Sequence, residues 1–297
     1  MIDNKGTSAR IRNTVIHLIV ILLGLICLLP LINIVAISFS GSAAVTANKV
    51  GLLPVDFTTL AYSRIISDSQ FWRSFGISVI RVALTLALNL VLVVPMSYAM
   101  TRKTSEFRFR NVYMNLLIFA MLFNGGMIPT YIVVKNLGLL NSIWALILPG
   151  AVPVFSVILM MNFFKGIPRA LEEAAIVDGA NPLQVLLHVM IPCAKPSIAT
   201  ISLFSVVGSW NDFFSGLIYM QKVKDYPIMT YIQSLSIDLQ ELVNNAASSS
   251  ALENISELSN RNLNAAKIVV AVIPLLLIYP FLQKYLISGM TMGAVKE

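Results

Sequence analysis

Polar residues recur along an otherwise apolar stretch in the last third of the chain. At intervals of three or four residues stand Ser205, Ser209, Asp212, Gly216 and Tyr219. A helix would place them on one face, beside Trp210 and Asn211. Hydroxyl, carboxylate and amide groups bind sugar hydroxyls, and aromatic rings stack on sugars, so the face is a candidate substrate pathway. Small residues also suit close helix packing, and the sequence leaves both interpretations open.

A second polar stretch, residues 168–192, separates two long apolar segments. Pro168 suits the first turn of a helix, and Gly179 supplies the left-handed conformation that commonly ends one, which predicts a helix from Pro168 to about Asp178. Asn181 followed by Pro182 is a second helix start, which Pro192 should limit. The sequence thus predicts two short helices joined by a tight glycine turn.

Each of these short helices has a face suited to contact with another protein. The first presents a narrow face of small side chains, Leu171, Ala174 and Ala175. The second carries an apolar stripe at helical spacing, made of Leu183, Leu186, Leu187 and Met190. Because small side chains permit close approach, the pair is expected to insert into a groove on a partner.

Composition identifies the solvent around most of the chain as lipid. Of the 297 residues, 57% are hydrophobic and only 12% charged, and the mean hydropathy is +0.80. The net charge of +7 does not indicate nucleic-acid binding, because the basic residues form short clusters between apolar runs. The sequence therefore predicts an all-α membrane protein.

Six apolar segments are long enough to cross a bilayer within a single transmembrane domain, residues 1–297. They lie at about 15–39, 75–99, 112–134, 143–164, 197–220 and 267–287. The excess of Lys and Arg in the short connections places both termini and the loop 165–196 in the cytoplasm, and the longer loop 221–266 outside. The composition of 221–266 suits a solvated connector, whereas its length and the apolar residues spaced through it favour a partly folded cap.

Other function classes lack their motifs. Cys27 and Cys193 provide no disulfide or metal framework, and no catalytic or metal-binding residues are predicted. The chain has no phosphate-binding loop, no H-E-x-x-H and no G-x-S-x-G. A self-sufficient channel or secondary transporter would need several charges inside its spans, and only Arg81 and Asp212 qualify clearly. Arg81 is expected to snorkel or to pair with a neighbour.

The polar stretch resembles a known motif. Glu173-Ala174-Ala175, Asp178-Gly179 and the residues 189–192 are similar to the EAA loop of membrane subunits of ATP-binding-cassette (ABC) importers. In that family the loop is a coupling helix that docks on the ATPase. The resemblance implies an ATPase-coupling role for Glu172, Glu173, Ala174, Ala175, Asp178, Gly179, Ala180 and Pro192.

Further stretches resemble the maltose-type class of carbohydrate permeases, in its second membrane subunit and its oligosaccharide or polysaccharide-fragment branch. They are residues 127–131, 137–142, 145–149, 210–212 and 289–296. The resemblance implies the type I ABC importer fold, with six transmembrane helices and a cytoplasmic coupling helix. It also implies a bacterial cell membrane location, and a permease for a different small solute is the alternative.

The same resemblance implies a set of partners. They are a second permease forming a heterodimer, two ATPase subunits, an extracytoplasmic solute-binding protein, membrane lipid and a carbohydrate substrate, with no nucleic acid. No cofactor is expected on this chain, because ATP and Mg would bind to the partner ATPase.

Overall fold

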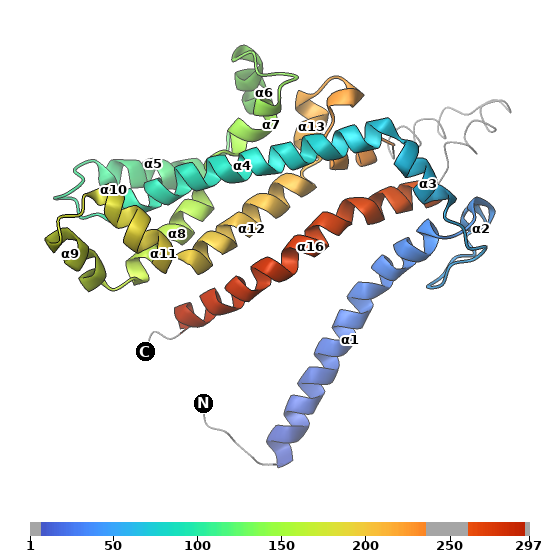
Figure 1. Cartoon of the computed structure of the whole chain (residues 1–297), viewed down its shortest axis with the longest axis horizontal. Helices are drawn as coiled ribbons and strands as arrows, with labels where there is room; N and C mark the ends of the chain where they lie inside the picture. Colours follow the sequence, from blue (N-terminus) through green and yellow to red (C-terminus); the bar gives the residue numbers. More distant parts are fainter. Residues whose placement is uncertain (1–6, 236–260, 295–297) are drawn as a thin grey trace. The chain divides into compact units, whose positions relative to one another are not determined.

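The computed structural model describes residues 7–235 and 261–294, and within these ranges the chain is helical and contains no strand (Figure 1). It divides into two compact units. The first comprises Met1–Ser69 and Leu235–Val272, and the second comprises Gln70–Ser234 and Ile273–Glu297. Residues 236–260 of the expected external loop lie outside the described part.

The first unit contains a long apolar helix that is exposed along most of its length. This helix, α1 (Thr7–Ser38), has a mean hydropathy of 3.0 in its segment 12–38, and none of its most apolar window is buried. A helix that is apolar on all sides without being packed suits a lipid environment. Short helices follow, α2 (Ser42–Thr46) and α3 (Leu60–Ser67), and Lys267 Nζ at the start of α16 (Arg261–Ala294) donates to Asp68 Oδ2 at 2.7 Å.

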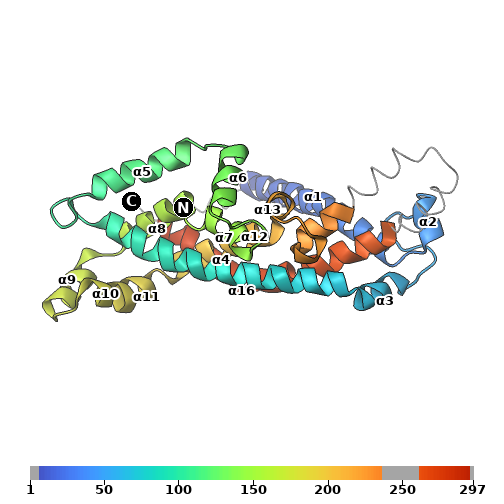
Figure 2. The same cartoon turned by 90° about the horizontal axis from the view of Figure 1, so that it is seen from above.

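The second unit is built along α4 (Ser69–Thr101), which Figure 2 shows running the length of this part. Its buried face is polar over much of its length, and the buried polar residues are Ser74, Ser78, Arg81, Thr85, Asn89 and Ser97. An unpaired polar group in lipid is costly, so these positions must face other protein segments or a cavity.

Glycine and proline bend two of the segments that the sequence predicts as single spans. Gly126, with φ of +88°, separates α5 (Arg110–Leu122) from α6 (Met127–Asn136), which lie at 117° to each other. Pro153 precedes α8 (Val154–Gly166), which is bent by 49° from α7 (Ile143–Ile147) and η1 (Leu148–Gly150). A third bent pair, Pro182–Cys193 and Lys195–Asn211, meets at 83°. When each of the three bent pairs counts as one span, the described residues contain up to six membrane-spanning candidates by length and composition.

The segment expected at 197–220 is also interrupted. Its first part, α12 (Lys195–Asn211), ends at Asp212, whose ψ of 97° is extended. The chain resumes in α13 (Phe214–Tyr219) and then η3 (Val223–Asp225). Asp212 Oδ1 accepts a hydrogen bond from Ser215 N–H at 3.1 Å, which stabilises the start of α13. The polar stripe of the sequence is therefore divided between two helices.

A hydrophobic core joins α4, α8 and α12 to an arm that projects at the C-terminal end of α4 (Figure 1). We call this the α9–α11 arm; it contains α9 (Arg169–Val177), α10 (Pro182–Val185), the π-helix η2 (Leu186–Met190) and α11 (Ile191–Cys193). Its contributions to the core are Val185, Leu186, Met190 and Ala194. The packing of these side chains ties the arm to the long helices.

Candidate functional site

The turn after α9 has the geometry that its sequence predicts. Gly179 has a φ of +86° and donates its N–H to Ile176 O at 3.0 Å, while Ala180 N–H donates to Ala175 O at 2.9 Å. These two bonds form a complete Schellman motif, which satisfies carbonyl groups that the helix end leaves free. Ala175 and Ala180 both pack against the core. The predicted helix from Pro168 to about Asp178 is confirmed to within one residue at each end.

The second short helix begins as predicted but does not end as predicted. Asn181 and Gln184 form a reciprocal capping box, with Gln184 N–H donating to Asn181 Oδ1 at 2.9 Å. Pro192 does not limit the helix, because Ile191 keeps helical angles and α11 continues to Cys193. The π-helix at Leu186–Met190 is separated from Pro192 by Ile191 alone, and this wider turn changes the backbone bonding ahead of the missing N–H.

The expected apolar stripe of this second helix is divided between the interior and the surface. Leu186 and Met190 are buried, as is Val185, but Leu183 is 63% exposed and Leu187 is 49% exposed. The π-turn breaks the regular spacing on which the expected stripe depends. Together with Ile176 and Val177, which is 86% exposed, these leucines leave apolar side chains at the surface of the arm.

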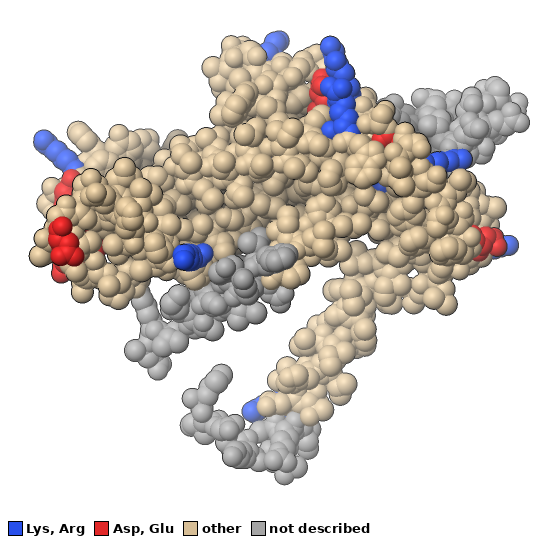
Figure 3. Space-filling view, in the orientation of Figure 1, with Lys and Arg blue, Asp and Glu red and all other residues tan. Residues whose placement is uncertain are grey.

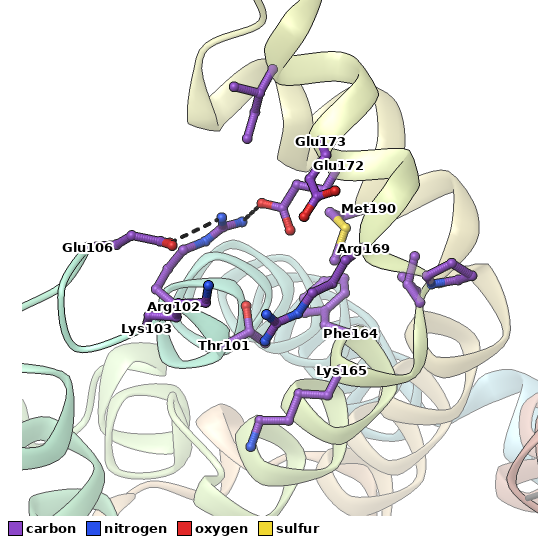
Figure 4. A pocket seen from close by; sticks show the side chains of 13 residues that line it. Thr101, Arg102, Lys103, Glu106, Phe164, Lys165, Arg169, Glu172, Glu173 and Met190 are labelled. Carbon is purple, nitrogen blue, oxygen red and sulfur yellow. Dashed lines mark ion pairs between the residues drawn. The ribbon is translucent and has the colours of Figure 1, made fainter.

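A charged pocket lies between the arm and the end of α4, with a volume of about 360 Å³ (Figure 4). Arg102 forms ion pairs with Glu172 and, at 3.6 Å, with Glu106, and its guanidinium lies 4.1 Å from the centre of the Tyr98 ring. Tyr98 Oη also donates to Glu172 Oε1 at 3.2 Å. Glu172 is therefore held by two side chains of one helix end, and the remaining charged lining residues are Lys103, Lys165, Arg169 and Glu173.

The predicted coupling residues divide according to their exposure. Glu173, Ala174, Asp178, Gly179 and Pro192 are exposed, and Figure 3 shows acidic side chains over α9. Glu172, Ala175 and Ala180 are half-buried and hold the arm in place. No described residue outside the arm covers the tip at Val177.

A second cavity, of about 280 Å³, lies between α4, α7–η1, α8 and α12–α13. Its polar lining includes Ser205, Ser209 and Asp212 from the candidate pathway, together with Thr85, Asn89, Ser156 and Ser215. Trp210 and Asn211 do not line it: Trp210 is buried with its ring 5.6 Å from that of Phe75, and Asn211 is exposed. Gly216 supports the alternative interpretation, in which the small residues serve close packing, because a Cβ at this position would lie only 2.8 Å from Thr230 Cβ.

Arg81 binds the break between α12 and α13. It forms an ion pair with the Asp212 carboxylate, donates from Nη1 to Asp212 O at 2.9 Å, and donates from Nη2 to Leu146 O at 3.4 Å. Of the two expectations for Arg81, snorkelling and pairing with a neighbour, the structure shows pairing. The pair neutralises both charges at this cavity and fixes Asp212 against α4.

Several residues of these two sites were not predicted from the sequence as site residues, among them Thr85, Asn89, Tyr98 and Arg102. The spacing of Arg81, Thr85 and Asn89, four residues apart in a long apolar segment, is a signal that could have identified the first two. Tyr98 and Arg102 meet Glu172 only through the fold.

Comparison with known proteins identifies the family. Residues 94–292 match the family of binding-protein-dependent transport system inner membrane components. The chain belongs to this family. It is also 40% identical over 273 residues to Protein LplC of Bacillus subtilis (strain 168), covering 92% of this chain and 90% of that protein. This multi-pass membrane protein is accordingly a transport permease.

Two further similarities agree with the family. The polygalacturonan/rhamnogalacturonan transport system permease protein YtcP of Bacillus subtilis (strain 168) is 37% identical over 293 residues, covering 97% of this chain and 99% of YtcP. A solved chain of a bacterial ABC transporter involved in the import of the acidic polysaccharide alginate has a TM-score of 0.82 at 33% identity, covering 95% of this chain and 98% of that chain. The fold is that of a type I ABC importer permease.

Proposed function

We propose that this chain is one of two permease subunits in an ATP-driven importer of carbohydrate, with oligosaccharides as the substrate. The partners are a second, related permease, two copies of an ATPase subunit and an external solute-binding protein. ATP and Mg bind to the ATPase subunits. The substrate class is supported by the names of two similar proteins, which refer to polygalacturonan, rhamnogalacturonan and alginate.

The exposed tip of the α9–α11 arm is the observation that carries this proposal. Val177, Ile176 and Leu183 are 86%, 53% and 63% exposed, on helices whose ends are fixed by a Schellman motif and a capping box. A rigid element with exposed apolar side chains suits insertion into a cleft of another protein. The acidic Glu173 and Asp178 beside these side chains give the contact a charged rim.

The proposed orientation follows from the excess of positive charge in the short connections. The arm lies in the cytoplasm with both termini, where the ATPase subunits bind, and the loop 221–266 faces the solute-binding protein. ATP binding closes the ATPase pair and carries α9 with it. The Glu172–Arg102 ion pair passes this displacement to the end of α4, and α4 lines the cavity that forms this chain's half of the pathway.

Site-specific photocrosslinking tests the docking. A photoreactive phenylalanine analogue is placed at Val177 in the full importer, in a Cys27→Ala, Cys193→Ala background. The matched control carries it at Phe57, which is 69% exposed and lies between the first two predicted spans, on the membrane side opposite to the proposed side of the arm. We expect an ATPase adduct from position 177 only. An active complex that gives no adduct at 177, or gives one equally at 57, would reject the assignment.

A further inference from the structure

Three residues on one face of α4 each carry a polar atom without a partner. Arg81, Thr85 and Asn89 lie four residues apart, so their side chains follow one another along the helix. They are 2%, 8% and 3% exposed. Among the residues that the structure describes, Arg81 Nε, Thr85 Oγ1 and Asn89 Oδ1 are buried and have no hydrogen-bond partner. Buried groups of this kind are rare, and three in a row call for a physical explanation.

All three residues line the 280 Å³ cavity, together with Ser205, Ser209 and Asp212 from the opposite helix segment. Asn89 Nδ2 donates to Ser205 Oγ at 2.9 Å, which joins the row to α12. Only one of the two amide atoms of Asn89 can face Ser205, so the other is free in either orientation of the amide. The unpartnered groups therefore lie along the seam between α4 and α12.

The Arg81–Asp212 ion pair determines what kind of ligand this row can accept. Both terminal nitrogens of Arg81 already bind the Asp212 carboxylate and backbone carbonyls, so the one nitrogen of Arg81 without a partner is Nε, which carries a single N–H donor. The charge of Arg81 is balanced by Asp212. A carboxylate brought to this row would meet the negative charge of Asp212 and the acceptor oxygen of Asn89.

The free groups are one donor, one acceptor and one hydroxyl, which can act as either. Hydroxyl groups both donate and accept, so neighbouring sugar hydroxyls can satisfy all three, whereas carboxylate oxygens only accept. Phe204 also lines the cavity and is 47% exposed, which provides a ring for the apolar face of a sugar. The chemistry of the lining thus matches an uncharged, hydroxylated ligand.

We propose that the row Arg81–Thr85–Asn89, facing Ser205 across the cavity, is a subsite that binds hydroxyl groups of a saccharide and not its acidic groups. This inference rests on the proposed function and names the part of the substrate that this chain contacts. The three free atoms are covered in this conformation, so the ligand reaches them as α4 and α12 separate and the Asn89–Ser205 hydrogen bond opens. In alternating access, a transporter opens its cavity to one side of the membrane at a time, and the separation of α4 and α12 belongs to one of these openings.

The test uses the complete importer in proteoliposomes, with its solute-binding protein. The two probes are trigalacturonate and its carboxyl-reduced counterpart, which differ only in having a carboxylate or a hydroxymethyl group on each ring. We expect Thr85→Val and Asn89→Leu each to raise the KM of uptake about five- to tenfold for both probes, as the loss of one hydrogen bond predicts. Thr85→Ser, which keeps the hydroxyl, should restore a KM close to that of the wild type.

The matched control is Ser97→Ala on the same helix. Ser97 is also buried, but its hydroxyl bonds to Val93 O and Val157 O, and it does not line the cavity. Its KM should stay at the wild-type value, and size-exclusion chromatography of every variant complex reports assembly. An equal rise in KM for Ser97→Ala would overturn the subsite.

The remaining outcomes separate the inference from the function on which it rests. A KM that rises for trigalacturonate alone would show that the row binds carboxylates. Unchanged KM values for both probes would show that the row has only a structural role. Either result overturns the subsite and leaves the proposed import function intact. The wild-type complex is tested first, with these two probes and with oligosaccharides of rhamnogalacturonan and alginate. Uptake of none of them overturns the carbohydrate assignment and the subsite with it.

Discussion

Two arginines, one inside α4 and one directly after it, bind acidic residues in different surroundings. Arg81, within the span, pairs with Asp212, and Arg102, directly after the helix, pairs with Glu172 of the arm. The side chain of Arg81 is 3% exposed, whereas that of Arg102 is 21% exposed. Arg81 also binds two backbone carbonyls, while Arg102 has a second carboxylate, Glu106, at 3.6 Å and a ring face on Tyr98.

This difference indicates two mechanical roles. Arg81 has its partners fixed by backbone positions and a low-dielectric surrounding, so its pair defines a single geometry. Arg102 can exchange one carboxylate for another as the arm moves, because Glu106 belongs to its own connection and Glu172 to α9. We infer that the interior pair preserves the pathway and that the outer pair transmits motion.

The largest effect is expected from Arg81→Ala. This change leaves the partly buried Asp212 carboxylate without its cation, and breaking a buried pair typically costs about 3–5 kcal/mol. The complex should lose thermal stability or fail to assemble, as measured by size-exclusion chromatography and Tm. The double variant Arg81→Leu, Asp212→Leu should be less damaging than the single one, and a single variant as stable as the wild type would contradict the interior role.

The next effect is expected from Gly179→Val in the arm. Nothing lies within 4 Å of a Cβ at this position, so the penalty comes from the φ of +86° alone. A left-handed conformation costs about 1–2 kcal/mol for residues with a side chain, and a β-branched one is a pronounced outlier. Saccharide-stimulated ATPase activity should fall while assembly persists. Gly179→Asn, which tolerates this conformation, is the control, and equal activity in both variants would remove the turn from the coupling pathway.

A smaller effect is expected from Glu172→Gln, which weakens the outer pair. Because this pair is partly exposed, its worth is about 0.2–1 kcal/mol. The ratio of saccharide imported to ATP hydrolysed should decrease a few-fold without loss of the complex. Exchange of the two charges, Arg102→Glu with Glu172→Arg, should recover part of the ratio. A decrease in assembly instead of in the ratio would make the pair a scaffold like the interior one.

The smallest effect is expected from ionic strength. Salt screens solvent-accessible charges much more than buried ones. Raising the salt concentration should therefore lower the coupling ratio of the wild type slightly, and should have less effect on an Arg102→Leu, Glu172→Leu variant. The difference in Tm between the wild type and Arg81→Ala, which measures the interior pair, should stay constant as the salt concentration rises. A salt-sensitive interior pair would mean that water reaches it.

The arm shows which features a sequence can predict. Gly179 and Asn181 act through bonds to residues at most five positions away, so their roles follow from local stereochemistry. The contact of Arg102 with Glu172 depends on how α4 and α9 pack, and no local pattern contains it. The break at Asp212 was missed for the same reason, because the side chain that binds it, Arg81, comes from another helix. The family, in contrast, follows from motifs spread along the chain.

The π-helix at Leu186–Met190 gives the arm one place where the chain can change in length without changing direction. A π-turn holds one residue more than the corresponding α-turn. Removing a residue from an ordinary α-helix rotates all that follows by about 100° and shifts it by about 1.5 Å. Removing Leu187 or His188, both exposed, would instead let the backbone return to α-helix, and Pro192 and Ala194 would keep nearly their present directions. A one-residue deletion at these two positions should therefore be tolerated, whereas a one-residue deletion inside α9 should not.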